Sequence, residues 1–156
     1  MNAPDTNTLF HQRKAGVGCP MCPDSHSDDV VADLASGRVH LQNDADYRGY
    51  CILIFHRHAV EIHELTPEER SQWIEDMALL GKVITETCRP AKLNLSMLGN
   101  LVPHLHCHII PRYETDPDWG RPPVFRSPAE RAPLATEDYD TLKSALIAGL
   151  NGRNDL

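Results

Sequence analysis

Short runs of apolar and β-branched residues, and longer stretches with apolar residues three or four apart, divide this chain into predicted strands and helices. The runs that predict strands are 30–34, 38–42, 50–55, 92–98 and 104–111. Ser36-Gly37 separates the first two runs and Gly99-Asn100 the last two, which is typical of turns between neighbouring strands. Strands that pair mostly with their sequence neighbours predict an antiparallel sheet.

A long helix is predicted after the third of these strands. Thr66 is suited to be its N-cap, Pro67 occupies the first helical position and Glu69 completes a capping box. Because Pro90 cannot continue a helix, the element is expected over about 67–88. Its buried stripe is expected to consist of Trp73, Met77, Leu80 and Ile84.

A C-terminal helix is predicted from Thr136, because apolar side chains recur along one side of the following segment. They are Tyr139, Leu142, Leu146 and Leu150. Two helices and an antiparallel sheet of about five strands indicate an α+β fold, with one domain over residues 17–156. Residues 1–16 are polar and lack an apolar period, so they are expected to form a flexible N-terminal arm. Residues 113–133 hold five prolines and predict an ordered loop that covers part of the molecule.

The composition narrows the class of partner. A net charge of −7, from 15 basic and 22 acidic residues, argues against a nucleic-acid polymer but leaves room for a small phosphorylated ligand. There is no signal-peptide pattern and no apolar run long enough to span a membrane, so a soluble cytoplasmic protein is expected. The five cysteines are an odd number, and Cys51 and Cys107 fall on apolar strand positions. Reduced thiols or a metal site are therefore expected rather than a disulfide framework.

The last predicted strand contains three histidines that alternate with apolar residues: His104, His106 and His108. Alternate side chains of a strand share a face, so the pattern predicts a solvent-exposed row of imidazoles opposite a buried apolar row. The outer two histidines would stand about 13 Å apart, too far to bind one metal ion together. A neighbouring pair could still bind a metal with ligands from elsewhere. Three imidazoles on one face favour chemistry over an incidental solvated surface.

The run His104-Leu-His106-Cys-His108-Ile-Ile resembles the signature of the histidine-triad (HIT) superfamily. Its flanks extend the likeness, which covers about residues 17–125: 93–96, Gly99-Asn100, Pro111-Arg112 and 49–54. The resemblance implies a HIT-like fold with the sheet and helices outlined above. It also implies a homodimer that hydrolyses or transfers a small-molecule nucleotide, with His104, His106 and His108 as the candidate catalytic set.

The resemblance also implies individual roles. His106, the middle histidine, would be the nucleophile that forms a nucleotidyl-histidine, and His108 would donate to phosphate oxygens. Asn100 matches a glutamine that binds phosphate in relatives. The bond cleaved would be a phosphoanhydride or phosphoramidate of a nucleotide, as in a dinucleoside polyphosphate or an adenylate.

Nucleoside recognition in relatives comes from the end of the second strand and the turn after it, which here holds Gln42, Asn43 and Asp44. These side chains would bind ribose hydroxyls, or Asn43 and Asp44 would simply form the turn. Two positions depart from the family pattern. Leu101 stands where relatives often have Ser or Thr, and Tyr50 stands where His is common. Leu101 leaves open a nucleotide-binding module with little catalysis, and Tyr50 changes or removes a supporting contact.

Cys19-Pro-Met-Cys22 is a second candidate site. Two thiolates at this spacing can bind one tetrahedral zinc, but two further ligands are needed. Relatives with such a pair complete the site at positions that match His58 and His104, which implies a structural zinc held by Cys19, Cys22, His58 and His104. Without metal the pair would be two thiols, and a redox motif is less favoured because no thioredoxin-like pattern follows. A zinc-dependent hydrolase would need an open coordination position instead.

Overall fold

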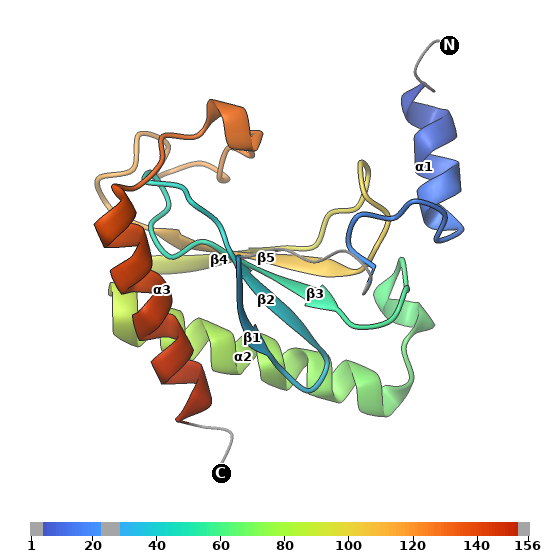
Figure 1. Ribbon diagram of the computed structural model, residues 1–156, viewed down its shortest axis with the longest axis horizontal. Helices are drawn as coiled ribbons and strands as arrows, with labels where there is room; N and C mark the ends of the chain where they lie inside the picture. The colour runs from blue at the N-terminus through green and yellow to red at the C-terminus, as the bar shows by residue number, and fades with distance from the viewer. Residues whose placement is uncertain (1–4, 23–28, 153–156) are drawn as a thin grey trace.

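The computed structural model describes residues 5–22 and 29–152. In this part of the chain five antiparallel strands form one sheet in the order β1-β2-β3-β5-β4 (Figure 1). The strands are β1 Val30–Asp33, β2 Gly37–Leu41, β3 Cys51–Phe55, β4 Lys92–Ser96 and β5 His106–Arg112. The predicted α+β fold with an antiparallel five-stranded sheet is thereby confirmed.

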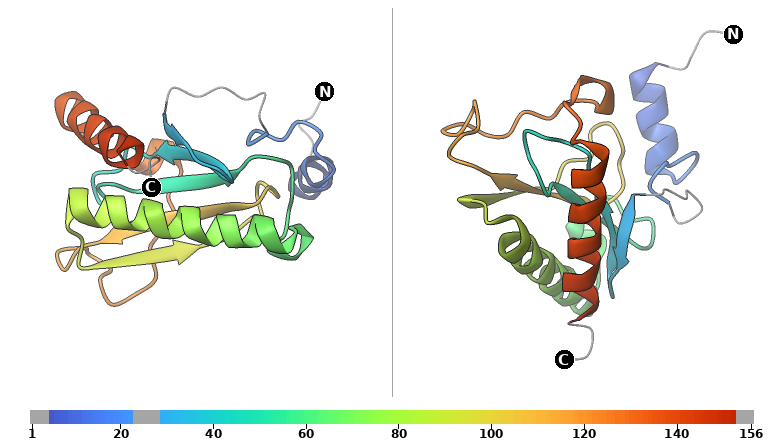
Figure 2. Two further views of the ribbon diagram at one scale, coloured as in Figure 1. Left: turned by 90° about the horizontal axis from the view of Figure 1, so that it is seen from below. Right: turned by 60° about the vertical axis from the view of Figure 1, so that its left-hand side comes forward.

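Two helices cover one face of the sheet. α2 (Pro67–Cys88) runs along the underside of the sheet, and α3 (Thr136–Asn151) packs against α2 and β1 (Figures 1 and 2). The main core lies between these helices and the sheet, and it includes the side chains of Cys107 and Ile109 from β5. Among the described residues, no helix has the length and apolar character that crossing a membrane requires.

α2 begins and ends where its sequence signals predict. The Thr66 hydroxyl accepts a hydrogen bond from the Glu69 backbone N–H, and the Glu69 carboxylate accepts one from the Thr66 N–H. The helix ends at Cys88, and the backbone of its C-cap Arg89 is left-handed with φ of 52°. The expected stripe is buried: Trp73, Met77, Leu80 and Ile84. The long helix is therefore placed by capping at one end and by Pro90 at the other.

The arm expected over residues 1–16 lies partly outside the described residues, and within the described part Thr6–Lys14 form helix α1. The Asp5 carboxylate caps it by accepting from the Thr8 N–H. None of its residues is buried, so the helix has no apolar stripe for sequence periodicity to reveal. It is held at its end instead: the Arg13 guanidinium donates to the carbonyl of Leu101, in the loop between β4 and β5.

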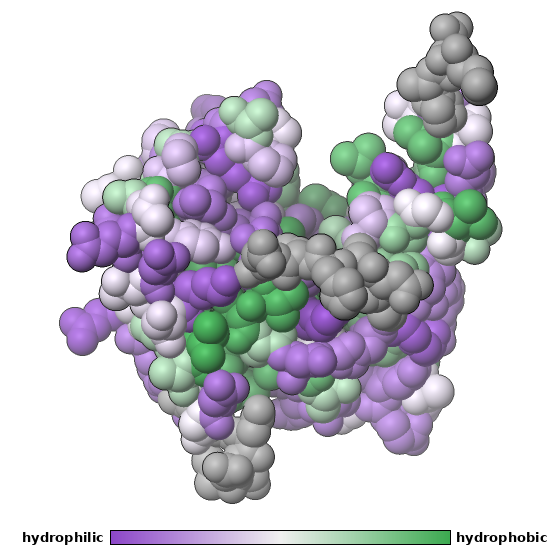
Figure 3. All heavy atoms as spheres, viewed as in Figure 1, coloured by the Kyte–Doolittle hydropathy of each residue, from purple (hydrophilic) through white to green (hydrophobic). Residues whose placement is uncertain are grey.

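The face of the sheet opposite α2 and α3 carries a smaller apolar cluster. Two groups of chain segments flank this face and form its walls. The cluster is formed by Tyr47, Tyr50, Ile52, Ile54 and Ile110. One wall is the long loop 113–135, and the other is α1 with the loop 97–103 (Figure 1). Figure 3 shows that the molecular surface is hollowed between the two walls. The alternation in β5 directs its even-numbered histidines to this face.

Candidate functional site

The three histidines lie at the N-terminal end of β5 and in the residues just before it. His106 pairs with Ile54 and His108 with Ile52 of β3, while His104 lies two residues before the pairing with β3 begins. Their apolar neighbours point into the main core, as predicted. The expected exposure of the histidine row is wrong, because His104 is only 1% exposed, His106 4% exposed and His108 half-buried. The alternation fixed which face the imidazoles share, but the chain segments that pack over them come from elsewhere in the sequence.

His106 is held in one tautomer by the backbone. Its Nδ1 lies 2.6 Å from the carbonyl oxygen of His104, and a carbonyl can only accept. Nδ1 therefore donates, and Nε2 keeps its lone pair. Burial lowers the pKa of His106, which favours the neutral ring. The unprotonated Nε2 faces the Nε2 of His108 at 3.1 Å.

His108 joins His106 to two aromatic residues. Its Nδ1 lies 2.5 Å from the hydroxyl oxygen of Tyr50, and the ring of Phe125 packs edge-on against it with centroids 5.0 Å apart. Burial, the neighbouring His106 and the charge of Arg131 lower the pKa of His108 to about 4. His108 is therefore neutral at physiological pH. The contact at residue 50, which the sequence left as changed or lost, is made by tyrosine.

Two of the predicted nucleoside-binding side chains hold the long loop. The Gln42 amide oxygen accepts from the Arg131 guanidinium at 2.8 Å, and the Asn43 amide oxygen accepts from the Leu134 N–H at 2.8 Å. Asn100, predicted to bind phosphate, is exposed in the loop between β4 and β5. The structure thus places Gln42 and Asn43 at one wall of the hollow and Asn100 at the other.

Asp44 is buried and forms the turn after β2. Its carboxylate accepts from the backbone N–H groups of Asp46 and Tyr47, and its second oxygen lies 3.7 Å from the Arg131 guanidinium. These contacts favour the turn-forming interpretation of this residue. Arg131, which the sequence interpretation did not single out, joins this turn to the site. The sequence signal was charge complementarity, because an arginine of the proline-rich loop meets an acidic turn.

A cavity lies beside the histidine row and not over it. It has a volume of about 930 Å³ and runs along β4 below the Trp119–Pro123 part of the loop. Ser96 lines it and is the strand partner of His108, so the cavity and the histidine pair are neighbours across one strand. Trp119 is 41% exposed, whereas Phe125 is the aromatic residue of the loop that contacts the histidines.

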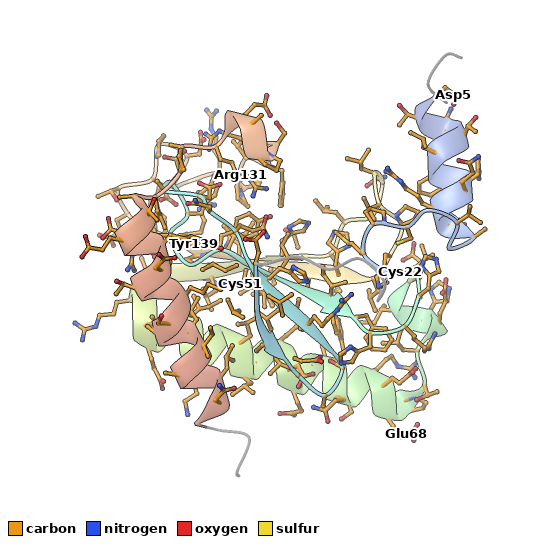
Figure 4. All side chains as sticks on the ribbon, in the orientation of Figure 1. Asp5, Cys22, Cys51, Glu68, Arg131 and Tyr139 are labelled. Carbon is orange, nitrogen blue, oxygen red and sulfur yellow. The ribbon has the colours of Figure 1, made fainter. Side chains whose placement is uncertain are left out.

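The second candidate site is assembled from three separate parts of the chain. Cys19 and Cys22 follow α1, His58 follows β3, and His104 precedes β5. Their four potential ligand atoms all lie within 4.8 Å of one another. Figure 4 shows Cys22 below α1, across the hollow from Arg131. The structure thus brings together all four residues predicted as metal ligands.

The geometry of this cluster fits a tetrahedral ion. Cys19 Sγ lies 3.4 Å from His104 Nδ1, and Cys22 Sγ lies 3.4 Å from His58 Nδ1 and 3.8 Å from His104 Nδ1. A zinc ion with ordinary Zn–S and Zn–N bonds has N···S edges of about 3.6 Å. Both rings donate from Nε2 to backbone carbonyls, His104 to Phe55 at 2.8 Å and His58 to Lys14 at 3.1 Å. Each Nδ1 therefore offers a lone pair to a metal, in the arrangement that oriented ligand histidines have.

Comparisons with known proteins identify the family of this chain. A model of the HIT domain matches residues 25–115. A histidine triad protein of Bradyrhizobium japonicum is 30% identical, with a TM-score of 0.71 over 78% of this chain and 89% of its own. One from Marinobacter aquaeolei is 28% identical, with a TM-score of 0.70 over 79% and 88% of the two chains.

A zinc-bound histidine triad family protein of Mycobacterium smegmatis shares the fold at 23% identity. Its TM-score is 0.59, over 86% of this chain and 94% of its own. No curated protein matches the sequence. The matched domain spans more than half of the chain and contains the whole histidine row, and the chain therefore belongs to the HIT domain family.

Proposed function

We propose that this protein cleaves a nucleotidyl phosphate bond through a covalent nucleotidyl-histidine on His106. Proteins of the HIT family are in general nucleotide hydrolases or transferases. The observation that carries the finer proposal is the tautomer of His106, whose Nδ1–H is taken up by the His104 carbonyl so that Nε2 presents a lone pair. The family implies the reaction class, and this contact supports His106 as the nucleophile.

The reaction has two displacements at one phosphorus atom. The lone pair of His106 Nε2 forms an N–P bond while the bond from phosphorus to the leaving oxygen of a phosphoanhydride, or to the leaving nitrogen of a phosphoramidate, breaks and the leaving atom takes that electron pair. Water then attacks the same phosphorus and releases a proton to solvent, the P–N bond breaks, and its electron pair returns to Nε2 with release of a nucleoside monophosphate. His108, beside Nε2, donates to a phosphate oxygen as negative charge develops. The substrate is a dinucleoside polyphosphate or an adenylate.

A nucleotide can reach His106 only past the side chains that pack over the His106–His108 pair. His106 is 4% exposed, and His108 is the more exposed of the two. Phe125, itself 44% exposed, lies edge-on against His108. We expect the nucleotide to enter from the hollow on this side and to displace the Phe125 ring. Asn100 contributes an amide to the phosphates from the opposite wall.

We also propose that Cys19, Cys22, His58 and His104 hold a structural zinc ion. When bound, zinc would stabilise the folded chain and fix the positions of its ligands. The site would be structural because four protein ligands leave no open position for water. The relative from M. smegmatis was solved with zinc, but at 23% identity that likeness establishes the fold alone. The support is the fit of the four ligand atoms in this chain. A closed site disfavours a zinc-dependent hydrolase.

The assignment to His106 is tested by trapping the intermediate. The protein is mixed briefly with a dinucleoside polyphosphate or an adenosine phosphoramidate labelled at the α-phosphate. It is then denatured at alkaline pH, because phosphoramidates on histidine are labile in acid. Label on the peptide that contains His106, and its absence in His106→Asn, is the expected result. Turnover without label, together with an active His106→Asn variant, would overturn the proposal.

A nucleotide-binding module with little catalysis is the second candidate. It is favoured by Leu101, which is 67% exposed at a position where relatives often carry a hydroxyl that protonates the leaving group. This candidate predicts binding of a nucleoside monophosphate and no turnover of any phosphoanhydride or phosphoramidate. Calorimetric titration with AMP, followed by assays over a panel of such substrates, separates it from the hydrolase.

We further propose that the protein is cytoplasmic, as expected from its sequence, and that it forms a homodimer, as the family resemblance implies. β4 is an edge strand in the described part of the chain, and Leu95 on it is 51% exposed. An unpaired strand edge with exposed apolar side chains is suited to pairing with a second copy. Sedimentation equilibrium tests this, and a monomer at micromolar concentration would contradict it.

A further inference from the structure

Tyr50 combines a buried ring with a hydroxyl at the histidine pair. It lies immediately before β3, is 3% exposed, and packs its ring in the small apolar cluster on the open face of the sheet. A tyrosine buried to this extent needs a hydrogen-bond partner for its hydroxyl. That partner is His108 Nδ1, at 2.5 Å. The question is which of the two groups donates.

The direction of this hydrogen bond follows from the contact between His106 and the His104 carbonyl. The His104 carbonyl obliges His106 Nδ1 to donate, so His106 Nε2 carries no proton in the neutral ring. His108 Nε2 lies 3.1 Å from that bare nitrogen. Two lone pairs at this distance would repel, so His108 Nε2 must carry the proton. A neutral His108 protonated at Nε2 has a bare Nδ1, and the Tyr50 hydroxyl therefore donates to it.

We propose that Tyr50 is a positioning residue that holds His108 in the Nε2–H tautomer and so aims an N–H donor at the reacting phosphate. The inference deepens the proposed function and rests on it for its catalytic consequence. In the other tautomer His108 would present a lone pair to His106 and to phosphate oxygens, which are acceptors as well. Tyr50 would act only through His108, without touching the reacting atoms.

Two further features support a donating hydroxyl. Burial raises the pKa of Tyr50 well above its usual value, so the phenol keeps its proton. The guanidinium of Arg131 lies 5.4 Å above the Tyr50 ring, a cation–π contact that holds the ring from the loop side. The same Arg131 bonds Gln42, so the loop and the turn after β2 together fix the ring.

The direct test is the protonation pattern of His108 in the resting protein. Two-bond and three-bond proton–nitrogen NMR correlations distinguish a protonated from a bare imidazole nitrogen. In the natural protein we expect a protonated Nε2 and a bare Nδ1 on His108. In Tyr50→Phe the donor is lost, so the chemical shifts of both His108 nitrogens should move toward the values of an averaged mixture of tautomers. Tyr50→His restores a donor and should return the pattern toward that of the natural protein.

The matched control is Tyr113→Phe, which removes a hydroxyl from another partly buried tyrosine. The Tyr113 hydroxyl donates to the Arg48 carbonyl at 2.6 Å and contacts none of the three histidines. This variant should leave the His108 nitrogens unchanged. A natural protein with His108 protonated at Nδ1, or a Tyr50→Phe variant with unchanged nitrogen shifts, would overturn the proposal.

Activity gives the second readout. Tyr50→Phe should lower kcat about tenfold with a smaller change in KM, because one oriented hydrogen bond acting in the transition state is lost. Tyr50→His should recover part of the loss, and Tyr113→Phe should keep the natural rate. Unchanged kcat in Tyr50→Phe would overturn the catalytic part. If the natural protein turns over no nucleotide, the proposed function fails, while the NMR pattern still decides the tautomer.

Discussion

The cluster of Cys19, Cys22, His58 and His104 lies next to the His106–His108 pair at the start of β5, yet the histidines of the two groups use opposite ring nitrogens. His104 donates from Nε2 to the Phe55 carbonyl and turns Nδ1 toward the cysteine sulfurs. His106 donates from Nδ1 to the His104 carbonyl and turns Nε2 toward His108. In each case a backbone carbonyl fixes the tautomer of the histidine and so decides which ring nitrogen is available for chemistry.

His104 links the two regions. Its ring faces Cys19 and Cys22, while its carbonyl orients His106, the proposed nucleophile. The four-residue cluster therefore holds the backbone that sets the geometry of the histidine pair. If the regions serve different purposes, variants should separate loss of turnover from loss of metal.

The largest separation is expected for His106→Asn. Without the nucleophile the covalent route closes, and turnover should fall about ten-thousand-fold or more. The zinc content and the melting temperature should stay close to those of the natural protein, because His106 is not part of the cluster. Steady-state kinetics and elemental analysis on the same preparation check this. Loss of zinc in His106→Asn would show that the two regions are not separable.

The converse prediction concerns the cluster. Cys22→Ser should reduce zinc from one ion per chain to a small fraction and lower the melting temperature by about 10 °C. That shift corresponds to about 4 kcal/mol of lost stabilisation for a site that zinc fills at a thousandfold excess over its Kd. Calorimetry with elemental analysis measures both effects.

Cys88→Ser is the matched control for the cluster. Cys88 is a half-buried cysteine at the end of α2, outside the four-residue group. It should retain its zinc and melt within a few degrees of the natural protein. If Cys22→Ser and the natural protein have equal melting temperatures and neither contains zinc, the proposed metal site is contradicted.

The elements with local signals were the predictable part of this molecule. The capping box at Thr66 and Glu69 and the proline at 90 gave α2 its bounds, because caps act within one helical turn. Period-two alternation placed His106 and His108 on one face and Cys107 in the core. α1 was not predicted, since it has no buried side and is held by Asp5 and by distant partners.

The coverage of the site could not be predicted from local pattern. Whether the histidine row faces water depends on Phe125 and Tyr50, which lie far from it in sequence. Likewise, nothing in the sequence around Gln42 predicts that its amide oxygen accepts a hydrogen bond from Arg131. The four candidate ligands were named because a family resemblance supplied the pairing of Cys19 and Cys22 with His58 and His104. Periodicity alone does not bring these residues together.

Acid should act on the histidine pair through His108. Its pKa is about 4 in the folded protein, against about 6.5 for an ordinary histidine. Between these values the unfolded chain binds a proton that the folded protein does not, so the free energy of unfolding falls as the pH falls from about 6.5 to 4. From pH 7 to pH 5 this contribution amounts to about 1–2 kcal/mol.

His108→Gln lacks this contribution and should lose correspondingly less stability over the same interval. Urea unfolding of both proteins at pH 7 and pH 5 gives the difference, and acid effects on the cysteine–histidine cluster cancel between them. Parallel losses in the two proteins would mean that His108 titrates at an ordinary pKa when folded.

The smallest effect is expected where the long loop touches the pair. Phe125→Ala removes an edge-on aromatic contact with His108, a contact of the kind that contributes about 1 kcal/mol, so the fold should be little affected. Carbethoxylation of His108, followed by mass spectrometry, should become several-fold faster because the ring that covers this imidazole is gone. Val124→Ala, at a neighbour that is also 44% exposed, should react at the natural rate. Equal rates in both variants would argue that Phe125 does not limit access, and that the burial of the histidine pair is set by Tyr50 and the sheet instead.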